Sequence, residues 1–166
     1  MPIWGELADG ARYAHDRMLA IWDEVRPDAV VIDCVTGFPA IPLAGVPWAR
    51  IVSANPLEMP DADIPPVFSG YAAAERTGWD EFRAEYARLS GPLQAAHSAF
   101  SEEAGAGPLP AGEFQYVSPY LNVYVFPEAA DFARAVPLGP AWHRVGSTVR
   151  TSDPDFDVPA ALPSER

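Results

Sequence analysis

The chain has 166 residues, which is enough for one domain of ordinary size and too few for two. Hydrophobic residues make up 49% of it and charged residues 20%, so the composition excludes a disordered or fibrous protein. The formal net charge of -12 repels phosphate backbones and anionic lipid surfaces, and we therefore expect no nucleic-acid partner.

Two further features bound the class of protein. The only cysteine, Cys34, excludes an intramolecular disulfide and a multi-cysteine zinc site, and its apolar neighbours predict a buried, unreactive thiol. The first ten residues lack the basic and apolar regions of a secretory signal, and no apolar run reaches the roughly 20 residues of a membrane span. We expect a cytoplasmic protein without a membrane span.

The first third of the chain alternates between helical and strand patterns. Apolar residues at helical spacing from Trp4 to Val25 predict a helix that ends before Pro27. The continuous apolar run 29–32 predicts a strand covered on both faces, with Asp33 at its carboxyl end. Residues 36–44 predict a short helix between a Thr36 cap and a Gly45 stop, and residues 48–53 a second strand.

The remaining segments continue this alternation around long loops. Residues 54–76 form a Pro-rich loop of the kind that binds ligands or moves. Thr77 with Asp80 predicts the start of a helix that continues to Phe100 with a kink at Pro92. Strands are predicted over 121–126 and 142–145, and a polar, linker-like tail over 150–166. The alternation predicts an α/β domain over 1–149, built on a parallel sheet flanked by helices.

Asp33 is the most informative single residue, because ligands of open parallel sheets gather at the carboxyl ends of the strands. It is the only charged residue between Asp28 and Arg50. From the pattern alone, it either caps the next helix or serves a site. Ser53 and Asn55 follow the neighbouring strand and face the same crevice, although turn residues look alike.

Other patterns suggest little chemistry. The three histidines (His15, His97 and His143) have no carboxylate at triad or metal spacing, and we expect core or interface positions for them. Asp61 and Asp63 imitate the DxD of sugar transferases, and the aspartates at 153, 155 and 157 imitate a calcium loop, but solvated loop charges explain both. No Gly-rich phosphate cradle occurs, so neither a nucleoside triphosphate nor a dinucleotide has an evident site. We therefore expect neither a metal nor a cofactor.

The order and spacing of several short motifs resemble the acceptor-binding half of the UDP-glycosyltransferase family. The likeness is closest to bacterial macrolide-type enzymes of the GT-B type, which have two Rossmann-like domains. The motifs are Arg26-Pro27-Asp28-Ala29-Val30-Val31-Ile32-Asp33, Phe38-Pro39-Ala40, Gly45-Val46-Pro47, Ser53-Ala54-Asn55-Pro56, Phe126-Pro127 and Arg144-Val145-Gly146-Ser147. The resemblance implies an incomplete Rossmann-like domain that covers nearly the whole chain.

The resemblance also implies an activity, the transfer of a sugar from a UDP-sugar to a hydroxyl of a small natural-product acceptor. In that family an aspartate orients a base histidine and stabilises the charge that develops on it, and Asp33 matches this aspartate by position. Ser53 and Asn55, together with Phe68 and Tyr71 from the following loop, match the acceptor pocket.

The chain departs from the family pattern in lacking the opening strand, the base histidine and the donor-binding domain. A carboxylate without its imidazole partner is a poor base at neutral pH, so we expect no transferase activity from this chain alone. It is then a truncated product or one piece of a split enzyme that needs a complementary transferase chain. The alternative is a noncatalytic subunit that binds a small molecule or a partner chain through the 54–76 loop and an exposed sheet edge.

Overall fold

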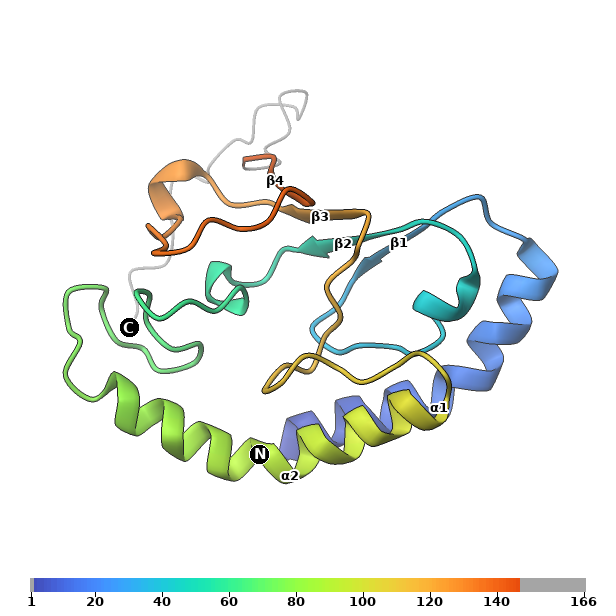
Figure 1. The fold of residues 1–166 in the computed structure, drawn as a ribbon, viewed down its shortest axis with the longest axis horizontal. Coiled ribbons are helices and arrows are strands. Elements are labelled where there is room, and N and C mark those ends of the chain that lie inside the picture. The colour runs from blue at the N-terminus through green and yellow to red at the C-terminus, as the bar shows by residue number, and fades with distance from the viewer. Residues whose placement is uncertain (1, 147–166) are drawn as a thin grey trace, which may run out of the picture.

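The computed structural model describes residues 2–146 and contains a four-stranded sheet (Figure 1). All neighbouring strands are parallel, in the order β1 (Val30–Asp33), β2 (Trp48–Val52), β3 (Leu121–Tyr124) and β4 (Trp142–Arg144). Two long helices, α1 (Pro2–Val25) and α2 (Trp79–Glu103), accompany three short 3-10 turns, η1 (Pro42–Ala44), η2 (Pro56–Glu58) and η3 (Glu128–Ala130). The predicted α/β, Rossmann-like architecture is confirmed.

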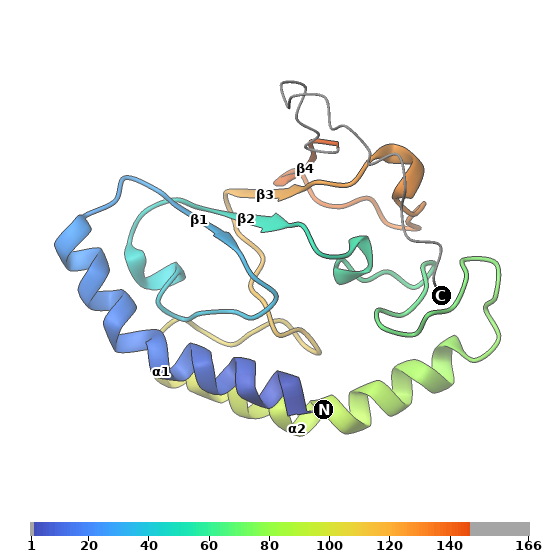
Figure 2. The same cartoon turned by 180° about the vertical axis from the view of Figure 1, so that it is seen from behind.

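The two faces of the sheet differ in what covers them. Both long helices lie on the same side of the sheet in the two opposite views (Figures 1 and 2). Side chains on one face are buried, among them Val30, Trp48 and Val52. On the other face, Val31 is 65% exposed and Leu121 is 37% exposed. The expectation that the first strand is covered on both faces is therefore wrong for the described residues.

Side-chain hydrogen bonds anchor the segment that follows β1 to both helices. The Trp22 indole of α1 donates to the carbonyl of Ala40 at 2.8 Å, and the His97 ring of α2 lies 2.9 Å from the carbonyl of Gly37. A Cβ on Gly37 would lie 2.8 Å from the ring of Tyr116, so only glycine fits there. These contacts fix the path of the chain directly after Asp33.

Several local predictions are wrong in detail. The expected helix over 36–44 is reduced to η1, because the preceding residues pack as an irregular segment. Thr36 is buried and its hydroxyl has no partner among the described residues, so it is no cap, whereas Gly45 does end the turn with a φ of 71°. Thr77 does not cap α2 either, since the helix starts at Trp79 after Gly78 in a left-handed conformation.

The other predicted elements are found close to their expected positions. The first helix ends at Val25, as Pro27 predicts, and α2 contains Pro92 in its interior. Figure 1 shows that α2 bends midway, as expected where proline removes a backbone hydrogen bond. The third and fourth strands end two and one residues earlier than predicted. The tail predicted over 150–166 lies outside the described residues.

Within residues 2–146, neither α1 nor α2 contains an apolar stretch long enough to cross a bilayer.

The unequal burial of the two sheet faces predicts unequal costs for the same truncation. Val52→Ala should lower the free energy of unfolding by about 2 kcal/mol, because Val52 is only 1% exposed and the truncation leaves a cavity. The matched control Val31→Ala should cost less than about 0.5 kcal/mol. Urea denaturation measures both values, and an equal loss in the two variants would show that a surface covers Val31 in solution.

Candidate functional site

Asp33 and Ser53 lie together at the carboxyl ends of β1 and β2. The register pairs Asp33 with Ile51, so Ser53 follows two residues further along the neighbouring strand. The Ser53 hydroxyl lies 2.8 Å from each carboxylate oxygen of Asp33, to which it donates, and both residues are exposed. Asp33 therefore does not cap a helix, and its carboxylate faces solvent with a neutral donor beside it.

Asn55 and Tyr71 occupy positions explained by local structure. The Asn55 side chain accepts a hydrogen bond from the Leu57 amide at 2.9 Å and caps η2. The ring of Tyr71 packs edge-on against Phe82, and its hydroxyl borders the space beside Gly78. Neither residue lines the aromatic cavity near α2. Of the predicted binding residues, Phe68 alone lines that cavity.

A cavity of about 220 Å³ lies between the 57–68 loop, the first turns of α2 and the 112–115 segment. Aromatic side chains line much of it, namely Trp4, Phe68, Phe82, Tyr86 and Phe114. The rings of Trp4 and Phe114 stack at 4.5 Å between centroids, and Phe68 meets Trp4 edge-on at 6.1 Å. Val35 connects the cavity to the segment that begins two residues earlier at Asp33.

Phe68 has an unusual backbone for an aromatic residue. Its φ is 66°, in the left-handed region that favours glycine, and its side chain is 60% exposed. Strain of this kind persists only where the surrounding structure imposes it, and it gathers at binding sites. The ring borders the cavity and contacts both Trp4 and Tyr86. The loop thus keeps a large aromatic ring at a position where glycine would be unstrained.

The polar end of the cavity is built on a buried arginine. Arg50 on β2 is 4% exposed and donates to the carbonyl of Tyr116 at 3.4 Å. Its guanidinium lies 3.9 Å from the carboxylate of Glu58, and its Nε has no partner among the described residues. Glu113 lines the same cavity, and both glutamates also border a second cavity of about 210 Å³. Arg50, Glu58 and Glu113 therefore border both cavities.

Burial and mutual charge shift the pKa values in this cluster. Burial raises the pKa of Glu113, an effect that Arg50 opposes and Glu58 strengthens. Burial also raises the pKa of Glu58, against the attraction of Arg50, and the charge of Asp33 adds to the rise. Burial lowers the pKa of Arg50. One guanidinium thus lies near two partly buried carboxyl groups, with Asp33 close enough to act on Glu58.

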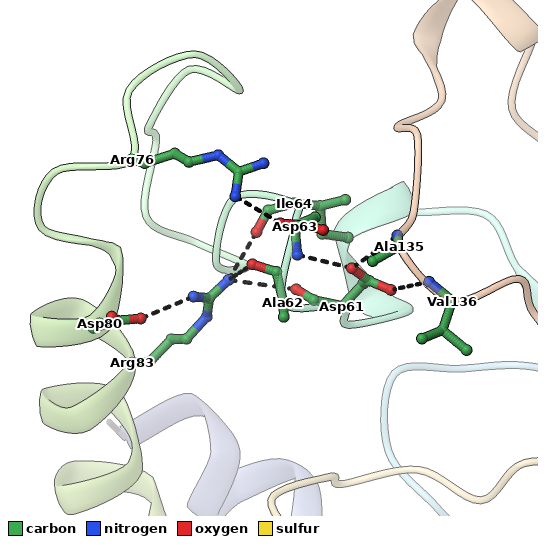
Figure 3. Close-up of polar contacts among 9 residues, drawn as sticks. All are labelled: Asp61, Ala62, Asp63, Ile64, Arg76, Asp80, Arg83, Ala135 and Val136. Atoms are coloured by element: carbon green, nitrogen blue, oxygen red, sulfur yellow. Dashed lines mark hydrogen bonds and ion pairs between the residues drawn. The ribbon is translucent and has the colours of Figure 1, made fainter.

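A second polar cluster holds the 61–64 loop in place (Figure 3). The Asp61 carboxylate accepts hydrogen bonds from the amides of Asp63, Ala135 and Val136, at 2.8, 3.3 and 3.2 Å. Arg83 of α2 donates to three carbonyls of the same loop. Asp61 therefore joins two distant parts of the chain, and its carboxylate is occupied by backbone donors.

Asp61 and Asp63 of the DxD-like pair both have partners within the chain. Asp63 pairs with Arg76 at 2.6 Å, while Asp61 is bound to backbone amides. Among residues 2–146, no three His, Cys, Asp or Glu side chains are grouped as a metal site requires. The interpretation of Asp61 and Asp63 as loop charges agrees with this geometry, and the aspartates at 153, 155 and 157 lie outside the described residues.

None of the histidines and cysteine in the described residues forms a hydrogen bond with the Asp33 carboxylate. His97 is buried at the Gly37 carbonyl, as its expected core position requires, and His15 packs edge-on against Phe100. His143 is exposed on β4. Cys34 is a free, half-buried thiol, so the expectation of full burial is wrong. Within the described residues, the hydrogen-bond partner of the Asp33 carboxylate is Ser53 rather than an imidazole.

The sequence patterns missed the cluster of Arg50, Glu58 and Glu113. Arg50 did carry a signal, since it is the one charged residue in the otherwise apolar strand 48–52. Arg50 lies two residues from both Trp48 and Val52, and alternate residues of a strand share a face, so its side chain is expected on the buried face. Glu113 carried no signal, because it lies in a Gly- and Pro-rich loop whose path the pattern does not determine.

No protein-family model matches the sequence, and no curated protein matches it either. The chemistry of the site therefore has to be argued from its own geometry.

The backbone hydrogen bonds of Asp61 predict a pH-dependent contribution to stability. They lower its pKa from the ordinary 3.8, so the ionised form is favoured in the folded state. This stability is present above the ordinary pKa and is lost as the pH falls through the lower, folded pKa. Asp61→Asn should therefore lower the urea midpoint at pH 7, and the difference from the parent chain should shrink at low pH.

The exposed Asp16→Asn of α1 serves as the matched control and should leave the midpoint unchanged. Amide hydrogen exchange at Val136 provides a local readout, because its donor loses a charged acceptor in the variant. A midpoint difference of the same size at pH 7 and at low pH would mean that the Asp61 charge contributes nothing.

Proposed function

We propose that this chain is an acceptor-binding part of a UDP-glycosyltransferase-like enzyme that is inactive by itself. The observation that carries the proposal is the pairing of Asp33 with Ser53 at the carboxyl ends of adjacent parallel strands. In open α/β sheets, ligands bind at this edge. The expected position of the orienting aspartate agrees with this geometry.

The aromatic cavity is a second observation that supports the same proposal. It has the mostly apolar wall that is typical of a small-molecule site, with a few polar groups at one end. Val35, two residues after Asp33, lines it, so the cavity lies near the strand end that carries Asp33. Of the predicted binding residues, Phe68 lines the cavity and Ser53 bonds to Asp33, while Asn55 and Tyr71 make local contacts in the loop.

In the proposed reaction, Asp33 acts through an imidazole rather than on the acceptor directly. An imidazole that removes the acceptor proton becomes positively charged, and a carboxylate beside it stabilises that charge. Ser53 donates to Asp33 and holds its two oxygens toward the strand ends. The histidine and the UDP-sugar site are assigned to a complementary transferase chain or segment, since no described imidazole bonds to Asp33.

A binding and turnover experiment tests this function. Incubated with UDP-glucose and the fluorescent phenol 4-methylumbelliferone, the chain should bind the phenol and release no UDP. Phe68→Ala should weaken phenol binding about tenfold, because it removes an aromatic wall. Leu89→Ala, on the exposed side of α2, is the matched control and should bind normally.

The outcomes separate the two parts of the proposal. Release of UDP by the chain alone would overturn the claim that it is inactive by itself. Equal phenol binding by the parent chain and Phe68→Ala, or no binding by either, would contradict the assignment of the cavity to the acceptor.

A second candidate function is a noncatalytic assembly subunit, and the open face of the sheet favours it. Val31 and Leu121 are exposed there, and β1 has a free edge within the described sheet. The occupant we propose is a polypeptide that adds a parallel strand to β1 and covers Val31 with a helix.

Sedimentation of the chain expressed with its genomic neighbours tests this second candidate. A stable complex that Val31→Glu disrupts, while the variant keeps its own melting temperature, would support it. A monomer under all of these conditions would contradict it.

A further inference from the structure

The charged groups around the aromatic cavity do not balance. Two arginines and three acidic residues line it, namely Arg50, Arg83, Glu58, Asp61 and Glu113. Asp61 is bound to backbone amides, and Arg83 is bound to Asp80 and three loop carbonyls. Asp61 and Arg83 thus hold the loop through these contacts. The remaining charged groups are one cation, Arg50, and two carboxylates, Glu58 and Glu113.

Arg50 itself is committed mainly to one of those carboxylates. Its guanidinium bonds to the Tyr116 carbonyl and lies 3.9 Å from Glu58, while its Nε stays without a partner among the described residues. Among residues 2–146, no side chain or amide forms a hydrogen bond or ion pair with the carboxylate of Glu113. Glu113 is therefore the excess charge at the polar end of the cavity.

The position of Glu113 is nevertheless well defined. Its amide donates to the carbonyl of Pro110 at 3.0 Å, and its own carbonyl accepts from the Gln94 side chain at 3.1 Å. Phe114, the next residue, stacks on Trp4 in the cavity wall. The Glu113 side chain is half-buried at the end of an aromatic cavity, where a cationic ligand group would give its carboxylate a charge-assisted partner.

We propose that the cavity binds an apolar small molecule that carries a protonated amine, with the amine at Glu113. The amine supplies the positive charge that the cluster lacks. The aromatic walls favour a cation as well, because ring faces attract positive charge. The inference rests on the proposed function only in placing the acceptor in this cavity, and it names the class of acceptor.

Three probes with one ring system test the charge preference directly. At pH 7, 1-naphthylmethylamine is a cation, its N-acetyl derivative is neutral, and 1-naphthoic acid is an anion. Calorimetric titration of the chain should give the tightest binding for the amine, weaker binding for the amide and the weakest for the acid. Equal affinities for amine and amide would overturn the proposal, as would binding of none of the three.

A charge-removing variant assigns the preference to Glu113. Glu113→Gln keeps the size of the side chain and should weaken binding of the amine at least tenfold, while the amide should change less than twofold. The matched control is Glu85→Gln, an exposed residue of α2 paired with Arg88, which should bind both probes normally. Undiminished amine binding by a folded Glu113→Gln would overturn the proposal.

The comparison of probes in the parent chain stays decisive even where Glu113→Gln fails to fold. It also separates the two proposals. Equal binding of amine and amide that Phe68→Ala weakens would leave the acceptor cavity intact and refute only the amine. Preferential amine binding together with UDP release by the chain alone would instead refute only the inactivity of the isolated chain.

Discussion

The buried guanidinium of Arg50 is the constraint around which the rest of the site is arranged. It lies on the helix-covered face of β2, 4% exposed, where an unpaired charge would be strongly destabilising. Glu58 from η2 and the carbonyl of Tyr116 give it partners from two separate loops. The charge therefore holds the 56–58 and 113–116 segments against the sheet, and the aromatic cavity lies between these segments and α2.

The proposed acceptor site joins two features that differ in kind. Asp33 and Ser53 form an exposed polar pair at the strand ends, whereas the nearby cavity is lined by aromatic side chains and has charged groups at one end. Separate anchors fix each feature. The helices hold the segment after Asp33 through Trp22 and His97, and Arg83 holds the 61–64 loop. Contacts within the chain thus hold both features in place.

The sequence predicted those parts of the fold that depend on local periodicity. The helix before Pro27 and the four strands follow from apolar spacing and from the Pro and Gly residues between them. The pairing of Asp33 with Ser53 follows from parallel topology. Interactions across long sequence separations were not predictable in this way. Thr36 and Thr77 resemble caps locally, but burial and a left-handed Gly78 decide otherwise. Glu113 comes near Arg50 only because the 104–119 loop folds back over the sheet, which no pattern in that loop predicts.

The central claim is that Arg50 cannot neutralise both Glu58 and Glu113, so that one carboxylate keeps an uncompensated charge facing the cavity. Carbon-detected NMR of the glutamate carboxyl groups through a pH titration measures this directly. Arg50 and Glu58 are the charged neighbours of Glu113, and Arg50, Glu113 and Asp33 are those of Glu58. The account predicts that both glutamates titrate above the ordinary 4.5. Titration of both at or below that value would contradict it, because it would mean that the single guanidinium satisfies the two together.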